Sequence, residues 1–149
     1  MAAIDYAGIE DQLKTLLEAD ASLNGTRFYV EEEPQFGLQD AKAVAIFLHS
    51  RAPDPEQSLS AGKRTRNIIR LSLWSVFFSI ESYRVACTGR DALLGALELV
   101  LMKDRTVGGK VASSWLEGGQ FQSARDDSNS AFAAAAETIL VARASAINT

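Results

Sequence analysis

Lys103-Asp104-Arg105-Thr106-Val107-Gly108-Gly109-Lys110 is the stretch that decides the fold, because its paired glycines separate two regular elements. Before it, Arg90 to Met102 carries leucine and valine at helical spacing, which predicts an amphipathic helix. After it, Lys110 to Gln122 contains Trp115 and a second turn at Glu117-Gly118-Gly119-Gln120, which predicts a strand or a pair of short strands. The order helix, two-glycine turn, strand is therefore the strongest local signal in the chain.

Two helix signals and one strand signal precede this region. Thr88-x-x-Asp91 has the form of a capping box for the helix, with Asp where Glu or Gln is usual. Apolar residues from Ile4 to Leu17 also recur at helical spacing, which predicts a helix with one buried face. Asn24-Gly25 ends that region, and Thr26 to Val30 is rich enough in β-branched and aromatic residues to predict a short strand.

The middle of the chain predicts two strands separated by a loop. Ala43 to Leu48 is a continuous apolar run, typical of a central strand buried on both faces. Arg51 to Arg66 is polar, contains prolines and lacks apolar periodicity, so we expect a long exposed loop. Asn67 to Glu81 alternates, but its phase slips at Trp74-Ser75. Keeping both apolar sets on one core requires a β-bulge, a bend or a break there, and one long bent strand is favoured.

The last part of the chain is less decisive. Ser123 to Ser130 is polar and is expected to be another loop. In Ser130 to Ala144, an alanine run has helical propensity, whereas Thr138 to Val141 prefers a strand. The alternation of helices and runs of strands indicates an α+β fold with a mainly antiparallel sheet.

Composition describes one ordinary soluble domain. With 149 residues and 47% hydrophobic content, residues 1–149 can build a single core and are expected to form one domain. A net charge of -4 and a pI near 5.0 lack the basic excess that non-specific nucleic-acid binding needs. The amino terminus lacks the positive region of a signal peptide, and the longest apolar run, Ala92 to Met102, is too short to span a bilayer.

The residues that carry most enzyme chemistry are scarce. His49 is the only histidine and Cys87 the only cysteine, so no intramolecular disulfide and no cysteine-based zinc site can form within one chain. A structural strand-end histidine is favoured over a catalytic one, since no base, nucleophile and orienting group occur together. Gly62-Lys63-Arg64-Thr65 resembles the end of a phosphate-binding loop, but Gln57 replaces the first glycine and Arg64 the hydroxyl residue. The sequence predicts no enzyme and no cofactor or metal site.

Charged clusters are the remaining candidates for function. The cluster Lys63, Arg64, Arg66 and Arg70 is either a solubilising loop or a contact for an acidic partner surface. Paired carboxylates at Asp126-Asp127 and in Glu31 to Glu33 are interpreted as solvated charge. Trp74 and Trp115 are compatible with half-buried core positions and with interface positions, and both interpretations stay open.

Several of these features together resemble the tail terminator proteins of long-tailed bacteriophages, the tail-completion proteins that join heads to tails. The most specific feature is Asp104-Arg105-Thr106-Val107-Gly108-Gly109, an Asp-x-Thr-x-Gly-Gly turn between a helix and a strand. The N-terminal helix, the buried strand, the basic loop, the bent strand and the closing run Glu137 to Arg143 follow the same order over almost the whole chain.

The resemblance implies a fold and a role in assembly. The closing run would be a strand, which gives four to five strands, two packed helices and the order α-β-β-β-α-β-β. The protein would form a ring, expected to be a hexamer, that caps the completed tail tube and presents a surface to the head-tail connector protein. Its place would be the tail or neck of a virion made in the host bacterial cytoplasm, with no cofactor, no membrane and no specific nucleic acid. Contact residues would be Lys63, Arg64, Arg66 and Arg70 for the tube or a neighbour, with Asp126 and Asp127 in a second contact loop.

Two other classes stay open. A neck or connector protein of the same virion would share the fold and differ in which neighbour it contacts. A small nucleic-acid-binding α+β module that uses the basic loop would show strongly salt-dependent binding.

Overall fold

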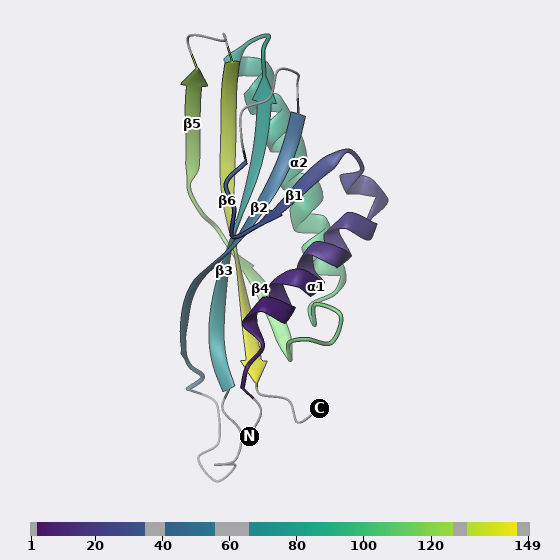
Figure 1. Ribbon diagram of the computed structural model, residues 1–149, viewed down its shortest axis with the longest axis vertical. Coiled ribbons are helices and arrows are strands. Elements are labelled where there is room, and N and C mark those ends of the chain that lie inside the picture. Colours follow the sequence, from purple (N-terminus) through teal and green to yellow (C-terminus); the bar gives the residue numbers. More distant parts are fainter. Residues whose placement is uncertain (1–2, 35–40, 56–65, 127–130, 146–149) are drawn as a thin grey trace.

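The structure is a computed structural model that describes residues 3–34, 41–55, 66–126 and 131–145. Its centre is a six-stranded sheet, and both helices pack on one face of that sheet (Figure 1). Apolar side chains meet between these two layers in the main core, which includes Leu13, Leu71 and Leu97. A two-layer arrangement buries one face of each helix and one face of the sheet.

The element order confirms the predicted fold class. The helices are α1 (Tyr6–Ala19) and α2 (Tyr83–Lys103), with a one-turn 3-10 helix, η1 (Ala21–Leu23), after α1. The strands are β1 (Thr26–Val30), β2 (Ala41–Pro53), β3 (Arg66–Ser79), β4 (Ser113–Glu117), β5 (Phe121–Asp126) and β6 (Ala131–Ser145). The strand order is β1-β2-β3-β6-β4, and β5 also pairs with β6. Of the pairs among these described strands, β1–β2 alone is parallel, so the sheet is mainly antiparallel, and it has six strands where four to five were expected.

Both helices begin at side-chain caps. The Asp5 carboxylate accepts a hydrogen bond from the Gly8 amide at 2.9 Å, which starts α1 in the predicted region. Ser82 caps α2, so this helix begins earlier than predicted. The expected cap at Thr88 is wrong, because Thr88 lies inside α2 and its hydroxyl donates to the Arg84 carbonyl oxygen at 3.0 Å. Neither described helix combines the length and the apolarity that a membrane crossing requires.

β3 is one long strand, but it has no bulge at Trp74-Ser75. Its register with β6 runs from end to end without a shift, so the prediction of one long strand is confirmed, and the alternatives of a bulge or a break are excluded. Leu71 and Leu73 belong to the main core under the helices, whereas Val76 and Phe78 belong to a second apolar cluster. Because strand side chains alternate between faces, these two sets lie on opposite faces of the sheet. The phase slip therefore marks the point along a regular strand where the large apolar side chains change from the face under the helices to the opposite face.

The bulge of the sheet lies in β2 instead. The register between β2 and β3 shifts between Leu48 and Ser50, which leaves His49 as the extra residue. Beyond the bulge, residues 51–53 continue to pair with β3, so the predicted loop is wrong for these residues. Their side chains are exposed and only their backbone pairs with β3. Such pairing leaves no apolar pattern in the sequence, which is why a loop was predicted. Residues 56–65 of the predicted loop lie outside the described residues.

The alanine run is a strand, because β6 includes it in full. Ala134 and Ala136 are buried on the helix face, and Ala134 pairs with Phe77 of β3. The helix approaches closely at this point, since a Cβ on Gly89 of α2 would overlap the Phe77 ring. Small side chains are needed where a helix passes so near the sheet, and this packing outweighs the helical propensity of alanine.

The region after the two-glycine turn forms two short strands. β4 and β5 pair antiparallel with β6, one after the other along the same edge. Between them, the Glu137 amide donates a hydrogen bond to the Gln120 carbonyl oxygen at 2.7 Å. Residues 123–126 belong to β5, so the predicted loop is wrong there, and residues 127–130 lie outside the described residues.

Candidate interaction surfaces

The two-glycine turn is a hydrogen-bonded loop between α2 and β4. The Asp104 carboxylate accepts hydrogen bonds from the Thr106 amide at 2.9 Å, the Thr106 hydroxyl at 2.7 Å and the Gly108 amide at 3.0 Å. The Gly109 amide donates to the Thr106 hydroxyl oxygen at 3.1 Å. These bonds lower the pKa of Asp104, with the Thr106 hydroxyl as the largest cause. Aspartate and threonine therefore build the turn itself.

Backbone geometry explains the glycines of this turn. The φ angles of Val107, Gly108 and Gly109 are 49°, 63° and 85°, in the left-handed region that favours glycine. A Cβ on Gly108 would lie 2.5 Å from Nε2 of Gln12 in α1. Val107 adopts the same unfavourable conformation because its side chain is buried in the main core. The Asp-x-Thr-x-Gly-Gly pattern thus fixes how α1, α2 and β4 meet.

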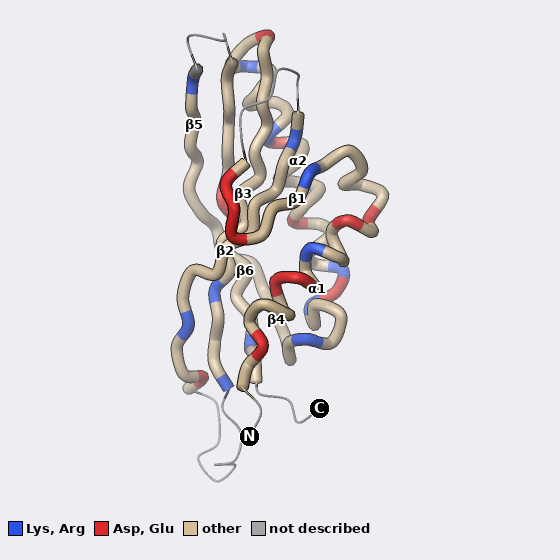
Figure 2. Tube along the Cα trace, in the orientation of Figure 1, with Lys and Arg blue, Asp and Glu red and all other residues tan. Residues whose placement is uncertain are grey.

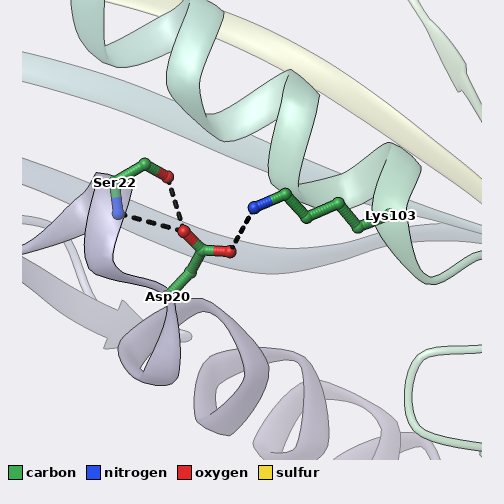
Figure 3. A network of polar contacts seen from close by, with 3 residues as sticks. All are labelled: Asp20, Ser22 and Lys103. Carbon is green, nitrogen blue, oxygen red and sulfur yellow. Dashed lines mark hydrogen bonds and ion pairs between the residues drawn. The ribbon is translucent and has the colours of Figure 1, made fainter.

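A second polar network ties the end of α2 to the segment after α1 (Figure 3). Nζ of Lys103 lies 2.9 Å from Oδ2 of Asp20, and Oδ1 of Asp20 accepts hydrogen bonds from the Ser22 amide at 3.0 Å and the Ser22 hydroxyl at 2.6 Å. The Ser22 hydroxyl, followed by Lys103, lowers the pKa of Asp20 to about 2. The end of α2 is therefore held in two ways. Lys103 bonds to Asp20 in the segment after α1, and Asp104 bonds to the turn that follows the helix.

One member of the predicted basic cluster is part of a buried ion-pair network. Nε of Arg66 lies 2.6 Å from Oδ2 of Asp54, whose side chain is fully buried. Nε of Arg143 in β6 lies 3.6 Å from the same oxygen. Asp54 therefore joins the end of β2 to β3 and β6, and Arg66 has a structural role at this end of the sheet.

The other predicted contact residues are divided between described and undescribed segments. Nε of Arg70 lies 3.5 Å from Oε2 of Glu117 across the sheet, and both side chains are partly exposed. Asp126 is the last residue of β5, where its backbone pairs with Ala131. Outside the described residues lie Lys63, Arg64 and Asp127. The structure thus brings Arg66 and Arg70 to one end of the sheet.

The acidic run after β1 (Figure 2) combines structural and solvated charge. Oε1 of Glu31 accepts a hydrogen bond from the Leu48 amide at 2.8 Å, so this side chain extends the pairing of β1 with β2. Glu10 of α1 is 3% exposed, and burial followed by a hydrogen bond with Glu31 raises its pKa to about 8. Burial and the hydrogen bond with Glu31 therefore favour the protonated form of Glu10. Glu32 and Glu33 are exposed, as the interpretation as solvated charge requires.

The residues considered for catalysis lie in separate elements. His49 is exposed at the β2 bulge and not at a strand end, so its predicted position is wrong. Cys87 is half-buried inside α2. Across the described ranges, no three His, Cys, Asp or Glu side chains gather as a metal site. The features that remain are surfaces.

The sheet face opposite the helices carries an apolar groove of about 410 Å³, here called the open-face groove. Among its lining residues are Ala45, Phe47, Trp74, Phe78, Ala124, Ala133 and Ala135, with Glu33 and Pro34 at one side. Four of these residues are alanines, so large side chains of another molecule would find room there. The sequence analysis missed this surface. The phase slip at Trp74-Ser75 was its signal, because that slip moves the apolar side chains of β3 to this face.

The two tryptophans are both half-buried. Trp74 lines the open-face groove. Trp115 of β4 lies against the Arg143 guanidinium, with 5.3 Å between Cζ and the ring centroid. Each ring therefore contributes to packing and also presents surface to the outside.

The fold and these surfaces define a two-layer α+β protein with an open sheet face and charged strand ends. No family model and no curated protein matches this chain. Among solved structures, the chain is similar to a chain in the virion of a native gene transfer agent particle, with a TM-score of 0.52 and 12% identity, over 96% of this chain and 99% of that chain. At this identity the similarity establishes a shared fold.

A weaker similarity is to a chain in the sheath/tube terminator of PVC, an extracellular contractile injection system, in its extended state. It has a TM-score of 0.39 and 16% identity, and covers 100% of this chain and 58% of that chain. That score is too low to establish a shared fold.

Proposed function

We propose that this chain is a structural protein of a phage-like tail, a terminator that caps the completed tail tube as a ring and offers a joining surface to the head-side connector. The observation that carries the proposal is the fold shared with a chain of a virion over nearly the full length of both chains. The Asp-x-Thr-x-Gly-Gly turn supports it, because the turn lies between α2 and β4, as the resemblance to tail terminators requires.

The architecture suits such a role physically. A head-to-tail ring needs two different complementary surfaces on each subunit and a fixed angle between them. Two helices packed on a continuous sheet give a rigid scaffold, and the ends of long strands carry the contacts. In this proposal the partners are other copies of the chain, the tail tube protein and the connector protein, and no cofactor or bond chemistry takes part.

The proposed contacts with the tube or a neighbour are Lys63, Arg64, Arg66 and Arg70, of which Arg66 and Arg70 lie at one end of the sheet. Lys63, Arg64 and the partly exposed Arg70 supply positive charge to that contact, and Arg66 holds the end of the sheet through its ion pair with the buried Asp54. Asp126 and Asp127 form the second contact. Charge complementarity of this kind sets orientation and encounter rate at an interface.

A neck or connector protein of the same particle is the second candidate. The specific observation in its favour is that the similar structure is identified only as a virion. A terminator stops tube growth, whereas a connector acts after the tube is complete.

Deletion of the gene in a host that produces the particle separates these candidates. For a terminator, we expect tubes of uncontrolled length without heads, measured by electron microscopy of negatively stained particles. Tubes of normal length without heads would support the connector, and complete particles would reject both candidates.

Complementation of that deletion tests the contact residues. Charge reversal at Lys63 and Arg64 should prevent joining, whereas reversal at the exposed Arg84 of α2 should not. Arg66 is unsuitable for this test, because it pairs with the buried Asp54 and its reversal would disturb the fold. Normal particles with the Lys63 and Arg64 variant would reject the contact.

A further inference from the structure

α2 carries an apolar row that faces away from the sheet. The row, here called the α2 stripe, consists of Ala92, Gly95, Leu99 and Met102 at 3-4-3 spacing. Leu99 is 66% exposed and Met102 is 53% exposed. Leu93 and Leu97 are buried toward the sheet, on the opposite side of the helix. Large apolar side chains gathered on the outer face of a helix mark an interaction surface.

Gly95 is an independent sign that another molecule covers this stripe. Glycine is less favourable than alanine inside a helix, and α2 has 21 residues. A Cβ built on Gly95 would meet nothing within 4 Å, so packing within the described residues does not require glycine at this position. A glycine between Ala92 and Leu99 does permit the close approach of another chain.

The open-face groove is complementary to the α2 stripe in shape and in charge. Its alanines leave space, whereas Leu99 and Met102 project large side chains. Exposed Glu33 lies at one side of the groove, and Arg105 lies beside Met102, where both line a hollow of about 260 Å³. Opposite charges around two complementary apolar surfaces favour one mode of docking.

We infer that the α2 stripe of one copy docks into the open-face groove of a second copy. This inference rests on the proposed function, because a ring requires a head-to-tail contact, and it names the two surfaces that make that contact. Both helices lie on one face of the sheet (Figure 1), so the stripe on the outer side of α2 and the groove on the opposite face of the sheet point away from each other. Each copy can therefore engage two neighbours at once, which a head-to-tail ring requires.

Two surface variants and their mixture test this contact. Leu99→Glu places a charge in the stripe and Ala124→Glu places one in the groove, and both positions are exposed, so the fold should tolerate both changes. The full chain at high concentration should form oligomers in sedimentation velocity and native mass spectrometry, and each variant should be monomeric. Ile80→Glu, at a position 48% exposed outside both surfaces, is the matched control and should assemble.

The mixture identifies the head-to-tail arrangement. Each variant keeps one intact surface, so equal amounts of both should form one-to-one dimers and nothing larger. Assembly of the Ala124→Glu variant by itself would indicate a symmetric contact between two α2 stripes and would overturn the inference. A monomeric wild-type chain, or a mixture that stays monomeric, would overturn it too.

Gly95→Ala distinguishes a role of Gly95 in association from a role inside the single subunit, because only the former predicts weaker association. The added methyl group has open space in the single subunit, so the melting temperature of the monomer should rise. Association should weaken by at least tenfold, because the methyl group lies where the second copy approaches. Unchanged association would overturn the inference.

The inference and the proposed function can fail separately. Oligomers that form through these surfaces but never cap tubes would reject the terminator function alone. Caps that form normally with both Leu99→Glu and Ala124→Glu would reject this contact and leave the function standing.

Discussion

Asp54 and Arg66 form a contact of 2.6 Å between Oδ2 and Nε, and the Asp54 side chain is fully buried. The Asp54 amide also donates a hydrogen bond to the Arg66 carbonyl oxygen at 3.0 Å. Side chain and backbone therefore join the last residues of the β2 region to the first residue of β3. The same carboxylate lies 3.6 Å from Nε of Arg143, so three segments depend on one buried acid.

Asp54→Ala should lower the free energy of unfolding by about 2–4 kcal/mol, because it removes the buried carboxylate that balances the positive charges of Arg66 and Arg143. Chemical denaturation followed by circular dichroism measures this change. Glu117→Ala is the control, since it removes an ion pair of 3.5 Å between partly exposed side chains and should cost less than about 1 kcal/mol. Equal losses in the two variants would show that burial of Asp54 does not matter.

The two glycines of the Asp-x-Thr-x-Gly-Gly turn should respond differently to alanine. Both have positive φ, so each substitution should cost about 1–2 kcal/mol from the backbone. Gly108→Ala should cost more, because its Cβ would lie 2.5 Å from Nε2 of Gln12, whereas a Cβ on Gly109 meets nothing within 4 Å. Adding Gln12→Ala should recover that extra loss in a double-mutant cycle of thermal unfolding. No coupling between positions 12 and 108 would contradict this prediction.

Glu10 should make the free energy of unfolding fall as pH rises from 4.5 to about 8. Its pKa in the folded protein is about 8 and the ordinary value is 4.5, so the folded state holds a proton that the unfolded state releases in this window. The stabilising contribution is complete below pH 4.5 and is lost by about pH 8.

Glu10→Gln should remove this part of the pH dependence and be more stable than the wild-type chain at pH 8, because the amide donates a hydrogen bond to Glu31 at every pH. The difference between the two unfolding curves, measured from pH 4.5 to 8.5, isolates Glu10 from the carboxylates whose pKa is lowered. Parallel curves would show that Glu10 titrates as an ordinary glutamate.

Gly119→Ala should weaken the pairing with β6 between β4 and β5. Its Cβ would overlap the carbonyl oxygen of Glu137, which belongs to the backbone and cannot rotate away. We expect a loss of about 1–3 kcal/mol and faster hydrogen exchange at the Glu137 amide. Gly118→Ala is the matched control, since a Cβ at that position meets nothing within 4 Å. Equal exchange at Glu137 in both variants would refute the close approach.

Local patterns predicted the elements whose burial is one-sided. α1 lies where the apolar spacing placed it, because such spacing depends only on which face packs on the core, and β1 lies where β-branched and aromatic residues predicted a strand. Residues 51–53 could not be assigned, since they pair through backbone bonds, expose their side chains and show no apolar periodicity. The alanine run could not be assigned either, because the close approach of Gly89 to Phe77 decides it and these residues are distant from β6 in sequence.

The candidate surfaces were less predictable than the fold. Asp104, Thr106 and the glycines were singled out, because a turn uses residues close together in sequence. Asp54 was not, since Arg66 and Arg143 reach it only once β2, β3 and β6 are aligned. The open-face groove required knowing that the apolar residues after Trp74 face away from the helices.

β6 lies between β3 on one side and β4 with β5 on the other, and it is the last of the described strands in the chain. A ribosome therefore delivers every partner of β6 before β6 itself. Until then β3 has one unpaired edge, and β4 and β5 have no strand on which to assemble, so a nascent chain exposes edges that invite misassembly. Completion of the sheet is thus a late event in biosynthesis, because it waits for β6 to leave the ribosome.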